Sequence, residues 1–222
     1  MNLFARVFCF NDMSYKHIRK DYQKSVFDFD SAQSNPVDQF RLWLNDAIES
    51  GIPDANAMCL STVDKIGHPH SRMVLLKEAN QDGIVFFTNY RSAKSIDIEF
   101  NPHVALNFYW CELERQVRIE GTAKKLSRDL CVDYFDSRPI NSRISAIISP
   151  QSEIIPSKQI LEEQIEYYKN NPDQIHCPEH WGGFIVQPLS FEFWQGRGDR
   201  LHDRLKYFSK DSNHWIREIL AP

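Results

Sequence analysis

The chain has 222 residues, a formal net charge of −4 and a pI near 6.1, and 42% of its residues are hydrophobic. This length suits one globular domain with short terminal additions and is enough to bury a sizeable core. The slightly acidic balance excludes a global positive field that would attract nucleic acid or an anionic membrane, so a bound anion needs a local basic cluster. Five cysteines without a Cys-x-x-Cys pair favour a reducing cytoplasm over a disulfide framework.

The N-terminal segment predicts an extension followed by a short helix or a mobile arm. Residues 1–10 are briefly apolar but too short for a signal peptide, and no later stretch is long enough to span a bilayer. A polar, charged segment begins at Met13, where we expect the natural start, and residues 15–22 are basic. We therefore divide the chain into an extension with its arm at 1–30 and a main domain at 31–222.

One helix is predicted before the first strand. Asn35 and Pro36 mark its start, with proline in the first helical position, and Gly51 marks its end. The apolar positions behind the proline follow the i, i+3, i+4, i+7, i+8 spacing of a single helical face. They are Phe40, Trp43, Leu44, Ala47 and Ile48.

The rest of the chain predicts short antiparallel strands with helices between them. The predicted strands are 57–63, 71–77, 84–88, 104–110, 116–126, 183–187 and 190–194. The predicted helices are 91–100, 129–137, 142–148 and 157–170. Strands and helices do not alternate one by one, which excludes a doubly wound fold and favours a mainly β fold with helices, in the form of a small decorated barrel.

Two cations flank a predicted buried strand. Arg72 and Lys77 enclose the apolar residues 73–76. Because they are five residues apart, they point to opposite faces of a straight strand, and each can then meet a different anionic group. The alternative is a pair of ordinary surface cations at the strand ends.

A second candidate site surrounds Pro139. Tyr134 and Arg138 lie four residues apart on one helical face, and Ser142 follows just beyond the proline. A phenol, a guanidinium and a hydroxyl that converge there suit a phosphate group. The alternative is a capped helix end with a solvent-facing arginine.

A third candidate lies near the C-terminus, where three cations and an aspartate fall within residues 200–204. His202 can exchange a proton near neutral pH, and Arg200 shares its face if the segment is extended. The alternative is a charged hairpin edge.

No metal site is predicted. His176, Cys177 and His180 lack a fourth ligand at a standard spacing, and Pro178 indicates a loop. The chain also lacks a P-loop, a Gly-x-Gly-x-x-Gly motif and a Gly-x-Ser-x-Gly motif.

Several short blocks, taken in their order, resemble the pyridoxamine 5'-phosphate oxidase family along residues 15–222. Each block alone is weak, but their succession is specific. The blocks are Arg72-Met-Val-Leu-Leu-Lys77, Phe86-Phe-Thr-Asn-Tyr90, Asn101-Pro102, Leu113-Glu-Arg-Gln-Val117, Tyr134-Phe-Asp-Ser-Arg-Pro139, Gln151-Ser152, Trp181-Gly-Gly183, Glu192-Phe-Trp-Gln-Gly196, Arg200-Leu-His-Asp-Arg204 and the terminal Leu220-Ala-Pro222.

The resemblance implies a fold, a cofactor and a set of site residues. The fold would be a homodimeric, FMN-binding split β-barrel with flanking helices, with two FMN sites at the subunit interface and a C-terminal segment that serves dimerisation and substrate binding. The implied FMN contacts are Arg72, Met73, Val74, Leu75, Leu76, Lys77, Phe87, Thr88, Lys94, Gln116, Gln151, Ser152, Trp194 and Arg204. The implied substrate contacts are Lys77, Tyr134, Arg138 and Ser142 at the phosphate, Arg200, Leu201 and His202 at the ring and reacting carbon, and Arg19, Lys20, Asp21 and Tyr22 in the arm. The implied catalytic residues are Arg200 and His202.

The resemblance also implies a reaction in the cytoplasm. Pyridoxamine 5'-phosphate and pyridoxine 5'-phosphate would be oxidised to pyridoxal 5'-phosphate, with O2 as electron acceptor, H2O2 as product and NH3 released from the amine. The alternatives are a related flavin oxidase of the phenazine type and a non-catalytic protein that binds flavin or vitamin B6. The first would lack the complete set of phosphate contacts, and the second would lack Arg200 or His202.

One departure from the family's pattern concerns the flavin phosphate. The family usually has Ser-Arg-Lys where this chain has Ser92-Ala93-Lys94. Losing one charge-assisted hydrogen bond costs roughly 1.5–3 kcal/mol if nothing replaces it. The departure therefore bears on FMN affinity and leaves the class of reaction unchanged.

Overall fold

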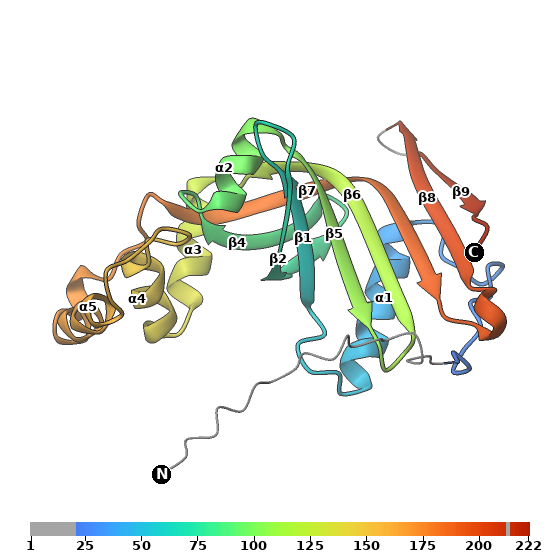
Figure 1. Ribbon diagram of the computed structural model, residues 1–222, viewed down its shortest axis with the longest axis horizontal. Helices are drawn as coiled ribbons and strands as arrows, with labels where there is room; N and C mark the ends of the chain where they lie inside the picture. The colour runs from blue at the N-terminus through green and yellow to red at the C-terminus, as the bar shows by residue number, and fades with distance from the viewer. Residues whose placement is uncertain (1–20, 212–213) are drawn as a thin grey trace, which may run out of the picture.

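The computed structural model describes residues 21–211 and 214–222. Its centre is a nine-stranded antiparallel sheet in the order β2-β1-β5-β6-β7-β4-β3, with β8 paired to β7 and β9 paired to β8. The sheet curls, with α3, α4 and α5 at one end of the molecule and β8 and β9 at the other (Figure 1). The strands are β1 Ala57–Val63, β2 Pro69–Leu75, β3 Glu78–Asn80, β4 Gly83–Asn89, β5 His103–Trp110, β6 Arg115–Lys125, β7 Trp181–Gln195, β8 Asp203–Asp211 and β9 His214–Ile219. The helices are α1 Pro36–Glu49, α2 Ala93–Phe100, α3 Arg128–Ser137, α4 Ile140–Ile148 and α5 Gln159–Asn170, with 3₁₀ turns at Pro172–Gln174 and Gly198–Arg200.

Helix α1 begins where the sequence predicts. The Asn35 side chain caps it by accepting a hydrogen bond from the Val37 N–H at 2.8 Å. Phe40 and Trp43 are buried against the sheet, but Ile48 is 55% exposed. Ile48 belongs to the last turn of the helix, where the apolar face opens onto a surface groove instead of the core. The predicted face is therefore correct as far as Ala47, which is fully buried, and wrong at Ile48.

The sequence prediction departs most from the structure at strand β7. The expected separate strands 183–187 and 190–194 form one strand of 15 residues. The register against β6 shifts between Glu120 and Gly121, which pair with Ser190 and Pro188, so Leu189 is the extra residue of a β-bulge. A bulge accommodates a proline that has no N–H for the ladder, so Pro188 bends the strand without ending it.

Strand β2 ends earlier than predicted. Its pairing with β1 stops at Leu75, and the Lys77 N–H donates to the Val85 carbonyl of β4 at 2.8 Å. The chain thus turns from one neighbour to another between these two residues. Lys77 lies beyond the bend, so the alternation that places Arg72 and Lys77 on opposite faces does not apply.

Two apolar clusters hold the elements together. The larger one lies under the sheet and is rich in aromatic rings, such as Phe40 against Phe108 at 4.8 Å between centroids. The smaller one joins Phe135 of α3, Ile144 of α4 and Trp181 at the start of β7. It fixes the helical end of the molecule onto the sheet. Within the described residues, no helix combines the length and apolar character needed to cross a bilayer.

Phe40→Ala tests how α1 is anchored. Phe40 is fully buried, so its truncation leaves a cavity and should lower the free energy of unfolding by about 3–5 kcal/mol. Leu42→Ala on the exposed side of the same helix is the matched control and should change it by less than about 0.5 kcal/mol. Urea unfolding followed by circular dichroism measures both variants, and equal losses would contradict this packing.

Candidate functional site

A cavity of about 940 Å³ opens between the β2 and β4 side of the sheet and helices α2, α3 and α4. It gathers many of the side chains that the sequence singled out, from segments up to 80 residues apart. The predicted residues that line it are Arg72, Met73, Val74, Leu75, Lys77, Phe87, Thr88, Lys94, Tyr134, Arg138, Ser142, Gln151 and Ser152. Leu76 is instead buried in the main core, because the bend after β2 turns it inward.

A buried ammonium group occupies one part of the cavity wall. Lys94 is 7% exposed, and its Nζ donates to Thr88 Oγ1 at 3.1 Å, Ser92 Oγ at 3.0 Å and Gln151 Oε1 at 2.9 Å. All three of these acceptors are neutral. Burial, together with the nearby charge of Arg72, lowers the pKa of Lys94 to about 8. A desolvated cation held by neutral groups is a ready site for an anion.

Arg72 approaches the same wall from β2 and is held by a polar network. Its Nη1 donates to Thr62 Oγ1 at 2.6 Å, and its Nη2 lies 3.6 Å from Asp97 Oδ2. Thr62 in turn donates to Asp97 at 2.6 Å. Burial lowers the pKa of the Arg72 guanidinium, and the carboxylate of Asp97 opposes that shift. The network fixes the direction of the guanidinium before any ligand binds.

The start of helix α2 completes this basic corner. The Ala93 N–H donates to Ser152 Oγ at 3.2 Å, and Ser152 has a left-handed backbone with φ of 75°. A helix N-terminus supplies N–H groups and a partial positive charge to an anion. Ala93 lines the cavity with a methyl group where the family's pattern has a guanidinium.

An aromatic wall with a second cation faces the basic corner. Tyr134 stacks on Phe87 with 3.9 Å between centroids, and the Arg138 guanidinium lies 4.7 Å from the centroid of the Trp181 ring. Arg138 Nη1 is buried and has no hydrogen-bond partner among the described residues. Burial lowers the pKa of Arg138, while Tyr134 opposes the shift. An unsatisfied buried donor at a cavity wall indicates a place for an acceptor group of a ligand.

Trp181 is a lining residue that the sequence analysis did not assign to the site. It opens β7, and its ring is parallel to that of Phe87 at 5.4 Å. The only signal for it was its position in the Trp-Gly-Gly block. Ser145 and Ser149 of the α4 region also line the cavity, and no pattern in the sequence distinguishes them from other helix residues.

The remaining predicted residues lie at the other end of the sheet. Trp194 and His202 are 4.7 Å apart between ring centroids, and Tyr22 packs edge-on against both, at 5.5 and 5.7 Å. Gln116 is paired with Trp194 across β6 and β7. Arg19 and Lys20 of the predicted arm lie outside the described residues, as does Met13.

The segment around Arg200 is not extended, so the condition under which Arg200 and His202 would share one face is not met. Residues Gly198–Arg200 form a 3₁₀ turn, and Asp199 and Arg200 have φ of 54° and 61°. His202 Nδ1 accepts a hydrogen bond from the Arg197 N–H at 3.1 Å. Burial and the charge of Arg200 lower the pKa of His202.

Arg204 is tied to the C-terminus. Its Nε and Nη2 donate to Glu192 Oε1 at 2.9 and 2.7 Å, and its Nη1 donates to the Ala221 carbonyl at 2.7 Å. The Leu220 N–H returns a hydrogen bond to the Arg204 carbonyl at 2.9 Å. These contacts hold the end of the chain against β8.

The two groups of predicted residues cannot meet within one chain. Trp181 lines the cavity at the first residue of β7, and Trp194 lies near its end. At the usual rise of a strand, thirteen residues span roughly 40 Å. A site that uses both groups therefore requires two copies of the chain.

The comparisons with known proteins bear on this arrangement. Residues 44–171 match the family Pyridoxamine 5'-phosphate oxidase, and residues 181–222 match the Pyridoxine 5'-phosphate oxidase C-terminal dimerisation region. The chain is 47% identical over 211 residues to a pyridoxine/pyridoxamine 5'-phosphate oxidase of Haemophilus influenzae. This alignment covers 95% of this chain and 100% of the relative. It is 46% identical over 206 residues to the enzyme of the same name from a Polaromonas species, with 92% and 95% covered.

This chain belongs to the pyridoxamine 5'-phosphate oxidase family. It is an oxidoreductase, and its cofactor is FMN. Its C-terminal part is a dimerisation region, which agrees with the predicted homodimer.

Two solved structures share the fold. PhzG from Burkholderia lata superposes with a TM-score of 0.85 at 24% identity and covers 91% of this chain and 100% of its own. A pyridoxamine 5'-phosphate oxidase-related, FMN-binding protein from Nostoc punctiforme superposes with a TM-score of 0.68 at 21% identity, with 82% and 97% covered. The predicted class, a mainly β split barrel with helices, is confirmed.

The basic corner fits a flavin phosphate. Lys94 offers a buried ammonium whose present acceptors are neutral, and Arg72 is held beside it. Ser152 and the N-terminus of α2 add neutral polar groups that suit phosphate oxygens. The corner therefore offers charge and polar groups suited to an FMN phosphate, with Ala93 where the family's pattern has arginine.

Lys94→Met tests the cost of this buried charge. The pKa of Lys94 is lower in the folded protein, about 8, than its ordinary value of 10.5, so the unfolded chain binds more protons between these pH values. The unfolding free energy of the cofactor-free wild type should therefore rise from pH 8 to 10.5 by more than that of the variant. At pH 7 the variant should be more stable by about 1 kcal/mol, yet bind FMN roughly tenfold to a hundredfold more weakly.

Urea unfolding at several pH values and fluorescence titration with FMN give the two quantities. Lys125→Met, which removes a partly exposed lysine on β6, controls for the loss of any lysine. Identical pH dependence in wild type and Lys94→Met would contradict the assignment of a depressed pKa to this side chain.

Proposed function

We propose that this chain oxidises pyridoxamine 5'-phosphate and pyridoxine 5'-phosphate to pyridoxal 5'-phosphate, with O2 as electron acceptor, H2O2 as product and NH3 released from the amine. The observation that carries the proposal is the unsatisfied Nη1 of Arg138 in a cavity that already has a separate basic corner at Lys94. One cavity thus offers two anion sites, one at Lys94 and one at Arg138 on the aromatic wall. A flavin phosphate and a substrate phosphate are the two anions that this reaction brings together.

The second anion site has the chemistry of a phosphate binder. Arg138 supplies a guanidinium that is stacked on Trp181, Tyr134 supplies a phenol, and Ser142 and Lys77 line the same cavity. A planar guanidinium can donate two parallel hydrogen bonds to phosphate oxygens. The stack on Trp181 leaves the edge of the guanidinium for the ligand. These residues would bind the substrate and orient its ring along the aromatic wall.

We propose that the other half of each site comes from the partner chain. Trp194 lies roughly 40 Å along β7 from Trp181 at the cavity, by the usual rise of a strand. His202 packs on Trp194, and Arg200 lies in the turn between β7 and β8. Gln116, Leu201 and Arg204 lie in the same half. A two-fold dimer would bring this half against the cavity of the other copy and would complete two equivalent sites.

In that arrangement the protein binds, orients and handles protons. FMN, held by the basic corner, would supply the redox chemistry that carries two electrons from the 4' carbon of the substrate to O2. Arg200 would orient the substrate ring and stabilise developing negative charge. Burial lowers the pKa of His202, which favours its neutral form, and this side chain would accept a proton from the amine or hydroxyl of the substrate.

The extent of the domain and the location of the protein belong to the same proposal. Residues 31–222 would form the oxidase domain, preceded by an arm, Asp21 and Tyr22 included, that closes over the substrate. The described cysteines are free thiols, which suits the reducing cytoplasm where we place the enzyme.

The spectrum of the purified protein tests the proposal directly. A yellow dimer should release FMN, one per chain, and should turn over both phosphorylated substrates while leaving unphosphorylated pyridoxine largely unused. Turnover of neither phosphate by FMN-loaded protein would refute the function.

Arg138→Ala should act on substrate binding. Removal of the guanidinium should raise KM for pyridoxine 5'-phosphate by roughly tenfold to a hundredfold and lower kcat less, because a charge-assisted contact to a phosphate is lost in ground and transition states alike. Arg138→Lys should recover little, since an ammonium cannot form the paired hydrogen bonds. Steady-state kinetics with saturating FMN measures this, and a change confined to kcat would contradict the assignment.

Arg200→Ala should slow the reduction of FMN by saturating substrate, because the side chain is assigned to the reacting end. His202→Ala should also slow the reduction of FMN, by no more than the roughly 10²–10⁴-fold that a positioned acid or base typically contributes. The oxygen half-reaction should change little in either variant. Anaerobic stopped-flow on FMN-saturated protein separates the two half-reactions, and wild-type reduction rates in both variants would remove these residues from catalysis.

A further inference from the structure

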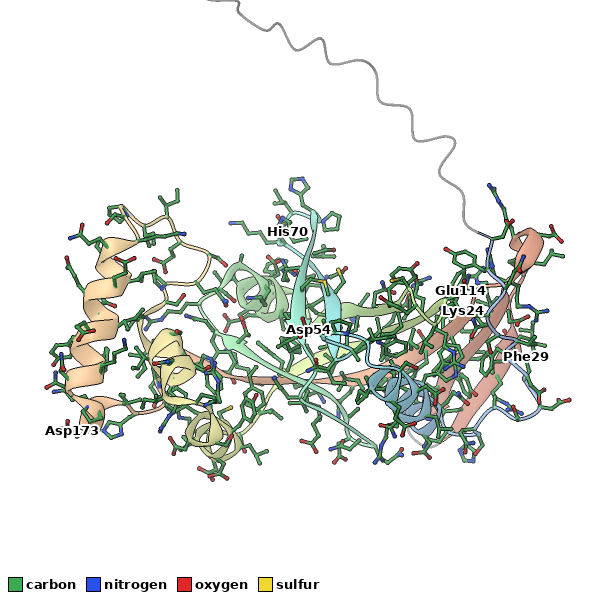
Figure 2. All side chains as sticks on the ribbon, turned by 90° about the horizontal axis from the view of Figure 1, so that it is seen from below. Lys24, Phe29, Asp54, His70, Glu114 and Asp173 are labelled. Carbon is green, nitrogen blue, oxygen red and sulfur yellow. The ribbon has the colours of Figure 1, made fainter. Side chains whose placement is uncertain are left out.

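A buried carboxylate holds the beginning of the described chain. Glu114 lies in the turn between β5 and β6, is 2% exposed and has a left-handed backbone with φ of 56°. Its Oε2 accepts hydrogen bonds from two consecutive backbone N–H groups, those of Gln23 at 2.9 Å and Lys24 at 3.1 Å. Figure 2 shows Glu114 and Lys24 together at one end of the molecule, opposite the end that carries Asp173.

Neighbouring contacts tie the same turn to the end of β7. The Glu114 carbonyl accepts from the Gly196 N–H at 2.7 Å and from Gln195 Nε2 at 3.2 Å. Lys24 Nζ donates to the Glu112 carbonyl at 2.6 Å. Glu114 therefore joins residues 22–27, which continue the arm from Tyr22 onward and are included in it below, to the strand end that leads into the turn at Arg200.

A second carboxylate holds the arm a few residues later. Asp203 Oδ2 accepts from the Phe27 N–H at 3.0 Å and from Arg197 Nη1 at 2.9 Å. Asp203 adjoins His202 in the chain. Both carboxylates recognise backbone N–H groups, so they fix the path of the arm largely independently of its side chains.

The path that they fix places Tyr22 against the reacting end of the site. The Tyr22 ring packs on Trp194 and His202 and forms a side-chain hydrogen bond with Tyr109. Gly196 lies directly beneath it. A Cβ at Gly196 would lie 2.7 Å from Tyr22 Cγ and 2.9 Å from its Cβ, so only glycine allows this approach.

We propose that Glu114 is a positioning residue that latches the arm and so holds Tyr22 over His202 and Trp194, where it helps to confine the substrate. The proposal rests on the function proposed above, because that function assigns His202 to the substrate. Glu114 itself does not need to touch substrate or flavin. Its effect passes through the backbone of Gln23 and Lys24 to Tyr22.

Hydrogen–deuterium exchange tests the latch without any turnover. In Glu114→Ala, the amides of Gln23 and Lys24 lose their acceptor, and their exchange should accelerate by roughly tenfold or more. Glu114→Gln retains a carbonyl oxygen that can receive the same two N–H groups, so its exchange should stay close to that of the wild type. Glu49→Gln, at an exposed carboxylate of α1 that lines a surface groove together with Lys24, is the control and should leave exchange unchanged.

Kinetics tests whether the latch serves the reaction. With FMN saturating, Glu114→Ala should raise KM for pyridoxine 5'-phosphate by roughly tenfold and lower kcat less, and Glu114→Gln should restore most of the loss. Gly196→Ala displaces Tyr22 from the opposite side while Glu114 stays intact. It should reproduce the kinetic loss, so the test does not depend on the folding of Glu114→Ala.

The outcomes separate the latch from the proposed function. Unchanged exchange in Glu114→Ala overturns the latch whatever the enzyme does. Accelerated exchange with wild-type KM and kcat in both Glu114→Ala and Gly196→Ala overturns the positioning role. Accelerated exchange in a protein whose wild type does not oxidise either phosphate supports the latch and refutes the proposed function instead.

Discussion

The length of β7 is the constraint on which the rest of the structure depends. This one strand pairs with β4 and β6, continues past Pro188 through a bulge and then pairs with β8. Its first residue, Trp181, packs with the helices, and Trp194 near its end meets His202. A strand of this length keeps the two groups of predicted site residues apart within one chain. The dimerisation region at residues 181–222 begins with the same strand, so the element that separates the two groups also belongs to the part that matches a dimerisation region.

The site keeps cations desolvated within a stable fold. Lys94 is buried among neutral acceptors, and Arg138 has a buried nitrogen without a protein partner among the described residues. Such groups lower the stability of the protein without its ligands, because Lys94 has lost water and gained only neutral acceptors, and Arg138 Nη1 has gained no acceptor among the described residues. The same loss strengthens their attraction for an entering phosphate, since fewer water molecules remain to be displaced. Arg72 differs from them because Asp97 already holds it, so it contributes direction more than unsatisfied charge.

The sequence predicted the fold where local patterns decide it. The cap at Asn35, the apolar spacing of α1 and the alternating strands are short-range signals, and the structure has these elements near the expected bounds. It failed where partners distant in the chain decide the geometry. The bend before Lys77 depends on a change of pairing from β1 to β4. The single strand through Pro188 depends on a bulge that Gly121 of another strand permits, because a Cβ there would lie 2.4 Å from the Gln187 carbonyl.

The candidate site could be predicted as a set of residues but not as an arrangement. The blocks of the family's pattern indicated a set of candidate side chains, and the cavity gathers those between residues 72 and 152 except Leu76 and Gln116. No local pattern shows that Trp194 lies at the end of β7 opposite to the cavity, or that His202 packs on it there. Glu114 was also out of reach, since its partners are backbone groups 90 and 91 residues away, and a backbone donor leaves no mark in the sequence.

The contacts of Arg204 bear on how the protein can be handled. Its guanidinium joins Glu192 to the carbonyl of Ala221, the residue before the last one in the chain. If an affinity tag were fused after Pro222, only Pro222 would separate it from Ala221, whose carbonyl helps to hold Arg204 in place. A fusion partner attached at the other end of the chain leaves these contacts of Arg204 in place.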